Sequence, residues 1–231
     1  MNLGNLRVLA RLTIPEAKIN RINNTNLDLI INEVVKDINL RLKLLNQDEK
    51  FDVTAEKYKY DLSSSAETVT RFAKIDDLGL YWNAGSSTTP DWTRLIPKTL
   101  KWLDDNIPQW RDAGSGDPLY YAKKGKYLYI HPTPDTALTD GFWLYFIEGA
   151  QAMSEDAHYP FGYSSEIEEY AILTDAIIKG IEWWITPMVG EEKGSILEEY
   201  LAILNIKKSM LKENLDITSD KETRLRVPHV C

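Results

Sequence analysis

The sequence predicts an α+β protein in which N- and C-terminal helices form a helical bundle, with an inserted antiparallel β-region and an extended C-terminal tail. Near both ends of the 231-residue chain, apolar residues recur at steps of three and four, as in amphipathic helices. Between these ends, short alternating segments rich in Tyr, Val and Ile are separated by turn residues, as in strands. The expected divisions are 1–50 and 154–213 for the bundle, 51–153 for the β-rich region and 214–231 for the tail.

Two helices are predicted in the N-terminal part. A short one is expected before Pro15, which stops it. A longer one, over about 26–45, follows, and we expect Thr25 and Asp28 to cap its first turn. Its stripe consists of Leu27, Ile31, Val34, Ile38, Leu42 and Leu45.

The middle region is predicted to be mostly strand. Because short turns separate its consecutive strands, we expect antiparallel pairing. A helix over 98–106, with Pro97 at its start, interrupts the strands. The expected strands are 57–62, 68–75, 119–122, 127–131 and 142–147.

Two helices are predicted in the C-terminal part. Ser165 and Glu168 have the spacing of a capping box that opens a helix over 166–187, and Ser195 and Glu198 repeat that spacing before a helix over 196–212. The short link between these helices predicts that they pack antiparallel.

Charge and composition exclude several classes of protein. The net charge of -8 opposes general binding to the phosphate backbone, which needs clustered Lys and Arg. The basic cluster Lys123–Lys126 is short and reads as a turn. No window is apolar enough to predict a membrane span. The single cysteine, Cys231, allows neither an intrachain disulfide nor a cysteine-based metal site.

No sequence motif of catalysis, cofactor binding or metal binding is present. His131, His158 and His229 are too far apart to form a paired zinc motif. We therefore expect no catalytic residue, no cofactor, no metal and no enzymatic activity. The candidate acids are Glu166, Glu168, Glu169, Asp76 and Asp77, and the favourable position of acids in the first turn of a helix accounts for the glutamates.

Aromatic residues are the most informative side chains. Four tryptophans cluster in the middle region, namely Trp82, Trp92, Trp102 and Trp110. Trp183 and Trp184 are adjacent on a helix, where neighbouring side chains point about 100° apart, so one of them should face another element or a neighbouring subunit. Three readings stay open for the aromatics: a protein interface, filling of the core between sheet and helices, and a platform for sugars.

Six segments follow one another along the chain in an informative order: Leu29-Ile30-Ile31-Asn32-Glu33-Val34-Val35, Pro108-Gln109-Trp110, Gly116-Asp117-Pro118-Leu119-Tyr120-Tyr121, Tyr129-Ile130-His131-Pro132-Thr133-Pro134-Asp135, Leu144-Tyr145-Phe146 and Ile167-Glu168-Glu169-Tyr170-Ala171. Their order and spacing resemble those of the head-to-tail adaptor (head-completion, or connector) family of tailed bacteriophages. One departure is Tyr60-Asp61-Leu62-Ser63, where the family pattern ends in Pro.

This resemblance implies a structural virion protein of the neck region, assembled in the host bacterial cytoplasm. It implies a homo-oligomeric ring, commonly a dodecamer, between the portal protein and the next neck or tail component. Such a ring extends the DNA channel, and DNA passes through its lumen without sequence-specific binding. A ring needs contacts between unlike faces of each subunit.

The end of the chain is the candidate portal contact. Leu225 and Val227 alternate with Arg224 and Arg226 before Pro228, a pattern that suits a strand added to a partner's sheet edge or laid in a groove. Because C-terminal tails of the resembled family commonly dock on the portal, the expected contact residues are Leu225, Arg226, Val227 and Pro228. The alternative is a frayed chain end, since chain termini are usually mobile.

Two other functions stay open on the sequence. A monomeric binding module would use the aromatic β-region to hold a carbohydrate or a peptide. A hydrolase would use two of the clustered carboxylates, held at catalytic separation in a cleft.

Overall fold

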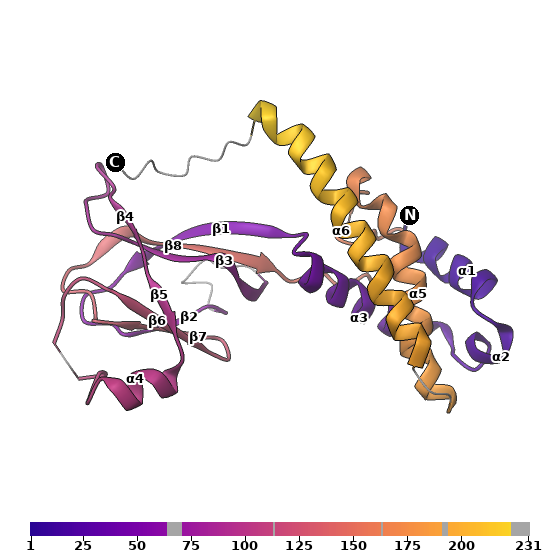
Figure 1. The fold of residues 1–231 in the computed structure, drawn as a ribbon, viewed down its shortest axis with the longest axis horizontal. Helices are drawn as coiled ribbons and strands as arrows, with labels where there is room; N and C mark the ends of the chain where they lie inside the picture. The colour runs from indigo at the N-terminus through magenta and orange to yellow at the C-terminus, as the bar shows by residue number, and fades with distance from the viewer. Residues whose placement is uncertain (64–70, 113, 163, 191–193, 223–231) are drawn as a thin grey trace. The chain divides into compact units, whose positions relative to one another are not determined.

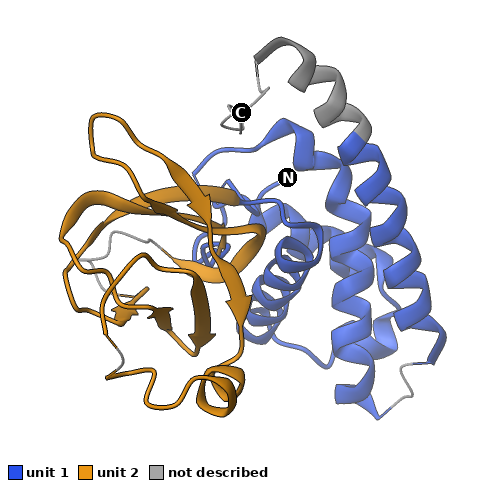
Figure 2. Cartoon of the chain, turned by 60° about the vertical axis from the view of Figure 1, so that its left-hand side comes forward, with its two compact units in different colours: residues 1–45, 149–231 blue, residues 46–148 orange. Residues whose placement is uncertain are grey.

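The computed structural model divides the chain into two compact units (Figure 2). Unit 1 comprises Met1–Leu45 and Gly149–Cys231, and unit 2 comprises Asn46–Glu148. The structure describes residues 1–63, 71–112, 114–162, 164–190 and 194–222. Unit 1 is built of helices and unit 2 mainly of strands (Figure 1), which confirms the predicted α+β class.

The described residues contain six α-helices and two 3-10 helices. They are α1 (Leu3–Thr13), α2 (Glu16–Ile19), α3 (Asn24–Leu42), α4 (Leu100–Asn106), η2 (Glu168–Leu173), α5 (Thr174–Ile185), η3 (Thr186–Val189) and α6 (Gly194–Glu222).

In the described part of the chain, eight strands form two four-stranded sheets. One sheet has the order β1-β8-β3-β4 and the other has the order β2-β7-β6-β5. The strands are β1 (Asn46–Val53), β2 (Lys59–Asp61), β3 (Phe72–Asn83), β4 (Trp92–Arg94), β5 (Ile96–Lys98), β6 (Tyr120–Lys124), β7 (Tyr127–His131) and β8 (Leu138–Glu148).

The core of unit 1 lies between α1, α3, α5 and α6. The predicted stripe of α3 is buried at Leu27, Ile31, Val34 and Ile38. Gly180 lets α5 approach both neighbours closely, because a Cβ atom there would lie 2.6 Å from Val34 Cγ1 of α3 and 3.1 Å from Tyr200 Cε2 of α6. Burial of these apolar faces against one another is the main stabilising term of the unit.

The helix starts differ from those expected from the capping patterns. Asn23, not Thr25, caps α3, and its side chain accepts a 2.8 Å hydrogen bond from the Asn26 backbone N–H. Both residue types suit an N-cap, so the preference alone does not choose between them. The box at Ser165 does not cap a helix either, since η2 begins after Ile167 without a side-chain cap.

The core of unit 2 is formed by alternating inward side chains of both sheets. From β8, Phe142, Leu144 and Phe146 are buried, and Tyr60 and Leu80 pack in the same cluster. The tight β6–β7 hairpin turns at Gly125, whose φ of 59° suits glycine. This hairpin is antiparallel, as predicted.

Several strand and helix bounds correct the sequence prediction. The β-rich unit begins at Asn46 rather than at residue 51, with the unpredicted strand β1, whose polar residues give no alternating apolar signal. Helix α4 begins at Leu100, after the cap Thr99, because Pro97 belongs to β5. Strands β5 and β6 pair in parallel. The intervening segment, which contains α4, is long enough for the crossover that parallel pairing requires.

The last helix also extends beyond its expected end. Helix α6 runs to Glu222, so the expected extended tail over 214–231 is helical over 214–222. An apolar stripe marks the buried face of a helix. The stripe ends where the helix no longer packs against a neighbour, even when the helix itself continues. Among the helices of the described residues, none is both long and apolar enough to cross a membrane.

Candidate interaction surfaces

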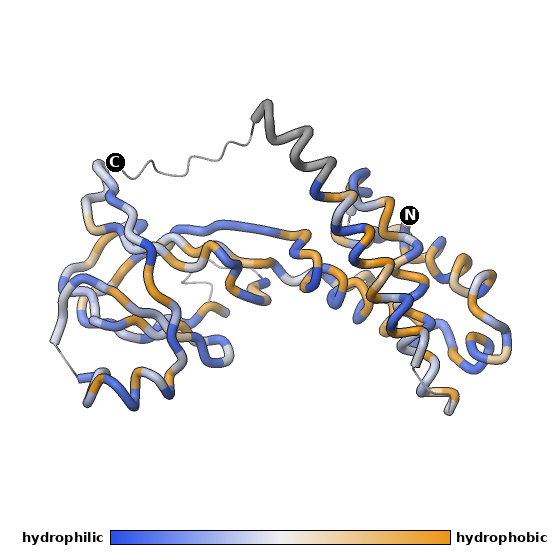
Figure 3. Tube along the Cα trace, in the orientation of Figure 1, coloured by the Kyte–Doolittle hydropathy of each residue, from blue (hydrophilic) through white to orange (hydrophobic). Residues whose placement is uncertain are grey.

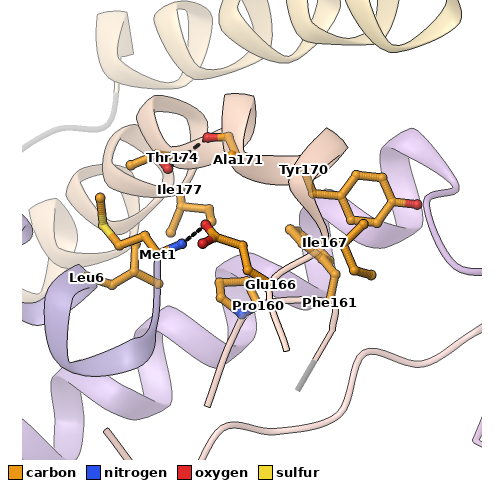
Figure 4. A pocket seen from close by; sticks show the side chains of 10 residues that line it. All are labelled: Met1, Leu6, Pro160, Phe161, Glu166, Ile167, Tyr170, Ala171, Thr174 and Ile177. Carbon is orange, nitrogen blue, oxygen red and sulfur yellow. Dashed lines mark hydrogen bonds and ion pairs between the residues drawn. The ribbon is translucent and has the colours of Figure 1, made fainter. Parts of the chain in front are cut away.

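One cavity of unit 1 is too small for a ligand. It lies among Met1, Leu6, Ile167, Tyr170 and other side chains shown in Figure 4, and its volume is about 20 Å³. That volume holds about one water molecule, whereas small-molecule pockets measure roughly 300–1,000 Å³. The open surfaces are therefore the candidate functional sites.

The candidate acids do not converge on a cleft. The Glu166 carboxylate pairs with the amino group of Met1 (Figure 4), and Glu168 and Glu169 are exposed in the first turn of η2. Asp76 and Asp77 belong to a separate bulge in β3 of the other unit. Within the described ranges, no group of three or more His, Cys, Asp or Glu is arranged to hold a metal ion.

His131 has a packing role in unit 2. It is 7% exposed at the end of β7, and its ring meets that of Trp110 edge-on at 6.3 Å. Burial lowers the pKa of His131, which favours the neutral imidazole. The neutral ring packs against Trp110 without a buried charge.

The clustered tryptophans divide between core and surface. Trp82 and Trp110 are buried, whereas Trp92 and Trp102 are half-buried. The pair on α5 is half-buried as well: the Trp183 ring stacks on Tyr200 of α6 at 5.8 Å, and the Trp184 ring meets Trp183 edge-on. Trp183 thus faces another element, as expected of one member of the pair.

An aromatic face covers the outer side of the first sheet. It consists of Tyr81 on β3, Trp92 on β4, and Trp143 and Tyr145 on β8, all half-buried. The Trp92 and Trp143 rings are 5.4 Å apart, and those of Trp143 and Tyr145 are 4.8 Å apart. Alternation along β8 turns these rings away from the core that Phe142 and Leu144 fill.

Two charged side chains of β1 border the aromatic face. Lys50 Nζ lies 5.3 Å from the Trp92 ring centroid and 5.1 Å from that of Trp143, in cation–π contact. The Trp143 indole N–H donates a 2.8 Å hydrogen bond to Asp48. Burial, followed by the nearby Asp48 carboxylate, raises the pKa of Tyr145 to about 12, so this hydroxyl stays protonated at neutral pH.

A lysine groove of about 560 Å³ lies elsewhere on unit 2. It is walled by the N-terminal half of β3 on one side and by β5, β6 and the start of α4 on the other. Five lysines line it, with Asp76 as the lone acid: Lys74, Lys98, Lys101, Lys123 and Lys124. These lysines come from segments far apart in the sequence. The sequence alone therefore indicates only the Lys123–Lys126 cluster.

Aromatic rings hold two of these lysines. Lys98 Nζ lies 4.2 Å from the Trp102 ring centroid, and Lys123 Nζ lies 5.1 Å from that of Phe72. Lys101 pairs with Asp105 of its own helix at 2.8 Å. Cation–π contacts leave the positive charge of Lys98 and Lys123 uncompensated, so the groove is electropositive in an acidic chain.

A third surface is a helical groove of about 680 Å³ on unit 1. Apolar side chains of α1, η2, α5 and α6 line it, among them Leu9, Ile172 and Ile203. Its charged residues pair internally, as in the 2.9 Å contact between Lys207 and Asp175. The helical groove therefore offers apolar area without net charge.

The expected portal-contact residues Leu225, Arg226, Val227 and Pro228 lie outside the described residues.

A model of the SU10 adaptor protein family matches residues 1–181, which include all of unit 2 and unit 1 as far as Ile181 in α5. The chain belongs to this family. No curated protein matches the chain.

Membership in the SU10 adaptor family confirms the resemblance to phage head-to-tail adaptors and makes the chain a structural adaptor of a bacteriophage. The matched segment contains the aromatic face and the lysine groove. All of α6 and the chain end lie beyond residue 181, outside the match. That the protein has no enzymatic activity stays a prediction.

Proposed function

We propose that this SU10-family adaptor forms a ring, with twelve subunits expected, between the portal protein and the next neck or tail component. In this arrangement it extends the DNA channel and presents a platform for tail attachment, and the helices of unit 1 act as a bundle that carries the β-rich unit 2. Segment 223–231 anchors each subunit to the portal. Assembly takes place in the host cytoplasm, and the ring resides in the virion neck.

The family match over residues 1–181 carries this proposal. The surfaces agree with it, because the cavity beside Met1 admits about one water molecule, whereas three open surfaces differ in chemistry. A closed ring of identical subunits needs unlike faces that fit each other. An aromatic face, an electropositive groove and an apolar groove without net charge supply such unlike faces.

Mass measurement in the presence of isolated portal rings tests the proposal. We expect native mass spectrometry to show several adaptor copies per portal, with a full complement that matches the portal symmetry. Ovalbumin, an acidic protein unrelated to phage necks, is the control for nonspecific adsorption. An adaptor that stays monomeric at every concentration and leaves the mass of the portal unchanged would contradict the proposal.

A second candidate function is that of a monomeric binding module for carbohydrate or peptide, which the aromatic face favours. Clustered aromatic rings are enriched at binding surfaces, and Asp48 and Lys50 add polar groups at their border. A ligand on this face would change tryptophan fluorescence, and Trp92→Ala would abolish that change. Trp102→Ala, away from the face, is the matched control. Ring assembly without any ligand response would exclude the binding module.

A further inference from the structure

Strand β1 is an open, acidic edge of the first sheet. In the sheet order, β1 pairs with β8 and has no partner on its other side among the described strands. Its acidic residues are Asp48, Glu49 and Asp52, and Figure 3 shows most of the strand as hydrophilic. An exposed edge carries unpaired backbone donors and acceptors, which can pair with another chain.

The charges of β1 are available for a partner. Asp48 accepts from the Trp143 indole and Asp52 accepts from the Asp140 backbone N–H at 3.0 Å, and each of these contacts uses one of about four acceptor sites of a carboxylate. Lys50, the one cation of the strand, is held over the rings of the aromatic face. The free edge is therefore electronegative.

The lysine groove lies beyond the opposite side of the same sheet. Strand β4 pairs only with Tyr81–Asn83 of β3, so the half of β3 that begins at Phe72 has no strand on its outer side within the described part of the chain. This uncovered half forms one wall of the groove through Lys74, Ile75 and Asp76. Strand β5, the edge of the second sheet, contributes to the other wall.

We propose that β1 of one subunit lies in the lysine groove of the next subunit and pairs with the uncovered half of β3. This inference rests on the proposed ring and names its subunit contact. An acidic edge and a basic groove on opposite sides of one sheet are unlike, complementary faces, and repeating one such contact generates a ring or a filament. Added strands bind through backbone hydrogen bonds, and the opposite charges fix which edge enters the groove.

A nucleic acid is the competing occupant of a lysine groove. The observations favour the acidic strand, because Asp76 lines the groove and Lys101 is already paired with Asp105. The open sheet edges that flank the groove suit an extended polypeptide, and a phosphate backbone makes no use of them.

Charge reversal separates the possibilities. The groove variant is Lys74→Glu with Lys124→Glu, and the edge variant is Glu49→Lys with Asp52→Lys; these side chains are not buried. The sedimentation velocity of each variant is measured without and with portal rings. Each variant should weaken self-association at least about tenfold. The chain that carries both sets of reversals, and an equimolar mixture of the two variants, should regain the wild-type assembly.

The control variant is Arg21→Glu with Lys208→Glu, two exposed positions of unit 1 that change the net charge as much as the groove variant does. It should assemble as the wild type does, and circular dichroism checks that every variant is folded. Normal assembly of both the groove and the edge variant would overturn this contact while leaving the ring intact. Failure of the wild type both to self-associate and to bind portal rings would overturn the ring and the contact together.

Nucleic acid binding is tested with the same variants and a double-stranded DNA fragment in a mobility-shift assay. Loss of DNA binding in the groove variant, together with failure of the combined reversals to restore assembly, would assign the groove to the phosphate backbone and overturn the proposal. Rescue of assembly by the combined reversals supports it, because DNA cannot compensate for a reversed edge strand.

Discussion

The side chain of Asn32 on α3 forms two hydrogen bonds with the backbone of Met153. Asn32 Nδ2 donates to the Met153 carbonyl at 3.0 Å, and Asn32 Oδ1 accepts from the Met153 N–H at 2.8 Å. Asn32 is 8% exposed and Met153 is 2% exposed. The amide thereby satisfies both polar groups of a buried backbone position and attaches the segment after β8 to α3.

Asn32→Ala is therefore expected to destabilise unit 1. The substitution leaves the N–H and the carbonyl of Met153 without these partners, which should cost about 2–4 kcal/mol in the free energy of unfolding. Asn26→Ala, at an exposed position of the same helix, is the matched control and should change stability by less than about 0.5 kcal/mol. Urea unfolding followed by tryptophan fluorescence measures both. Equal stability of the two variants would show that the amide contact is dispensable.

Ile177→Asp tests the packing of the helices in unit 1. Ile177 on α5 is 3% exposed in the core, where an aspartate would leave a charge without a partner. We expect a loss of at least about 3 kcal/mol and a much lower melting temperature. Ile206→Asp makes the same change on α6 at a side chain that is 60% exposed, so its melting temperature should stay close to that of the wild type. An unchanged melting temperature for Ile177→Asp would refute the proposed bundle.

The sequence predicts those helices and strands of this fold whose apolar side chains are buried along one face. The stripe of α3 and the strands β7 and β8 were recognisable because their buried residues recur with the period of the element. Strand β1 was missed because most of its residues are exposed, so Asn46 to Lys50 show no apolar alternation. The end of α6 was missed for a related reason, since its C-terminal residues lack a stripe.

The candidate surfaces were only partly predictable. The aromatic run that contains Trp143 and Tyr145 was recognised as a strand, and Trp92 was singled out, but their meeting on one face depends on the pairing of β3, β4 and β8. The lysine groove was not predicted. Lys74, Lys98 and Lys123 lie far apart in the sequence and come together only through the bulged path of β3 and the parallel pairing of β5 with β6.

The contact between Tyr200 and Asp37 predicts a pH dependence of stability. The Tyr200 hydroxyl on α6 donates a 2.9 Å hydrogen bond to the Asp37 carboxylate on α3. Burial, followed by the Asp37 charge, raises the pKa of Tyr200 above its ordinary value of about 10. In the unfolded chain this hydroxyl ionises near pH 10 while the folded chain keeps its proton, so stability falls as the pH rises above about 10.

Tyr200→Phe should therefore change the alkaline part of the stability profile. At pH 7 the variant should be about 1 kcal/mol less stable than the wild type, because one hydrogen bond is lost. Above about pH 10 the difference should shrink, because phenylalanine has no proton to lose. Tyr159→Phe, at another half-buried tyrosine of unit 1, is the matched control. Guanidinium unfolding between pH 7 and 11 measures the profiles, and a constant difference over this range would contradict the linkage.

Truncation after Glu222 tests the proposed portal anchor. Helix α6 is described as far as Glu222, so a chain that stops there keeps every helix of the described residues and loses the segment with Leu225, Arg226, Val227 and Pro228. If this segment binds by adding a strand or filling a groove, its apolar side chains must bury enough area to offset the loss of chain entropy on binding. We expect the truncated protein to keep the melting temperature of the full chain and to lose portal binding.

Two double variants distinguish the contributions of apolar and charged side chains of that segment to portal binding. Leu225→Ser with Val227→Ser should weaken binding to portal rings at least about tenfold if apolar burial anchors the tail. Arg224→Gln with Arg226→Gln should instead change mainly the salt dependence of binding, because exposed charges are screened. Sedimentation with portal rings at two salt concentrations measures both effects. Undiminished portal binding by the truncated protein would show that the anchor lies in the described units, and the helical groove lined by Leu9, Ile172 and Ile203 would be the next surface to substitute.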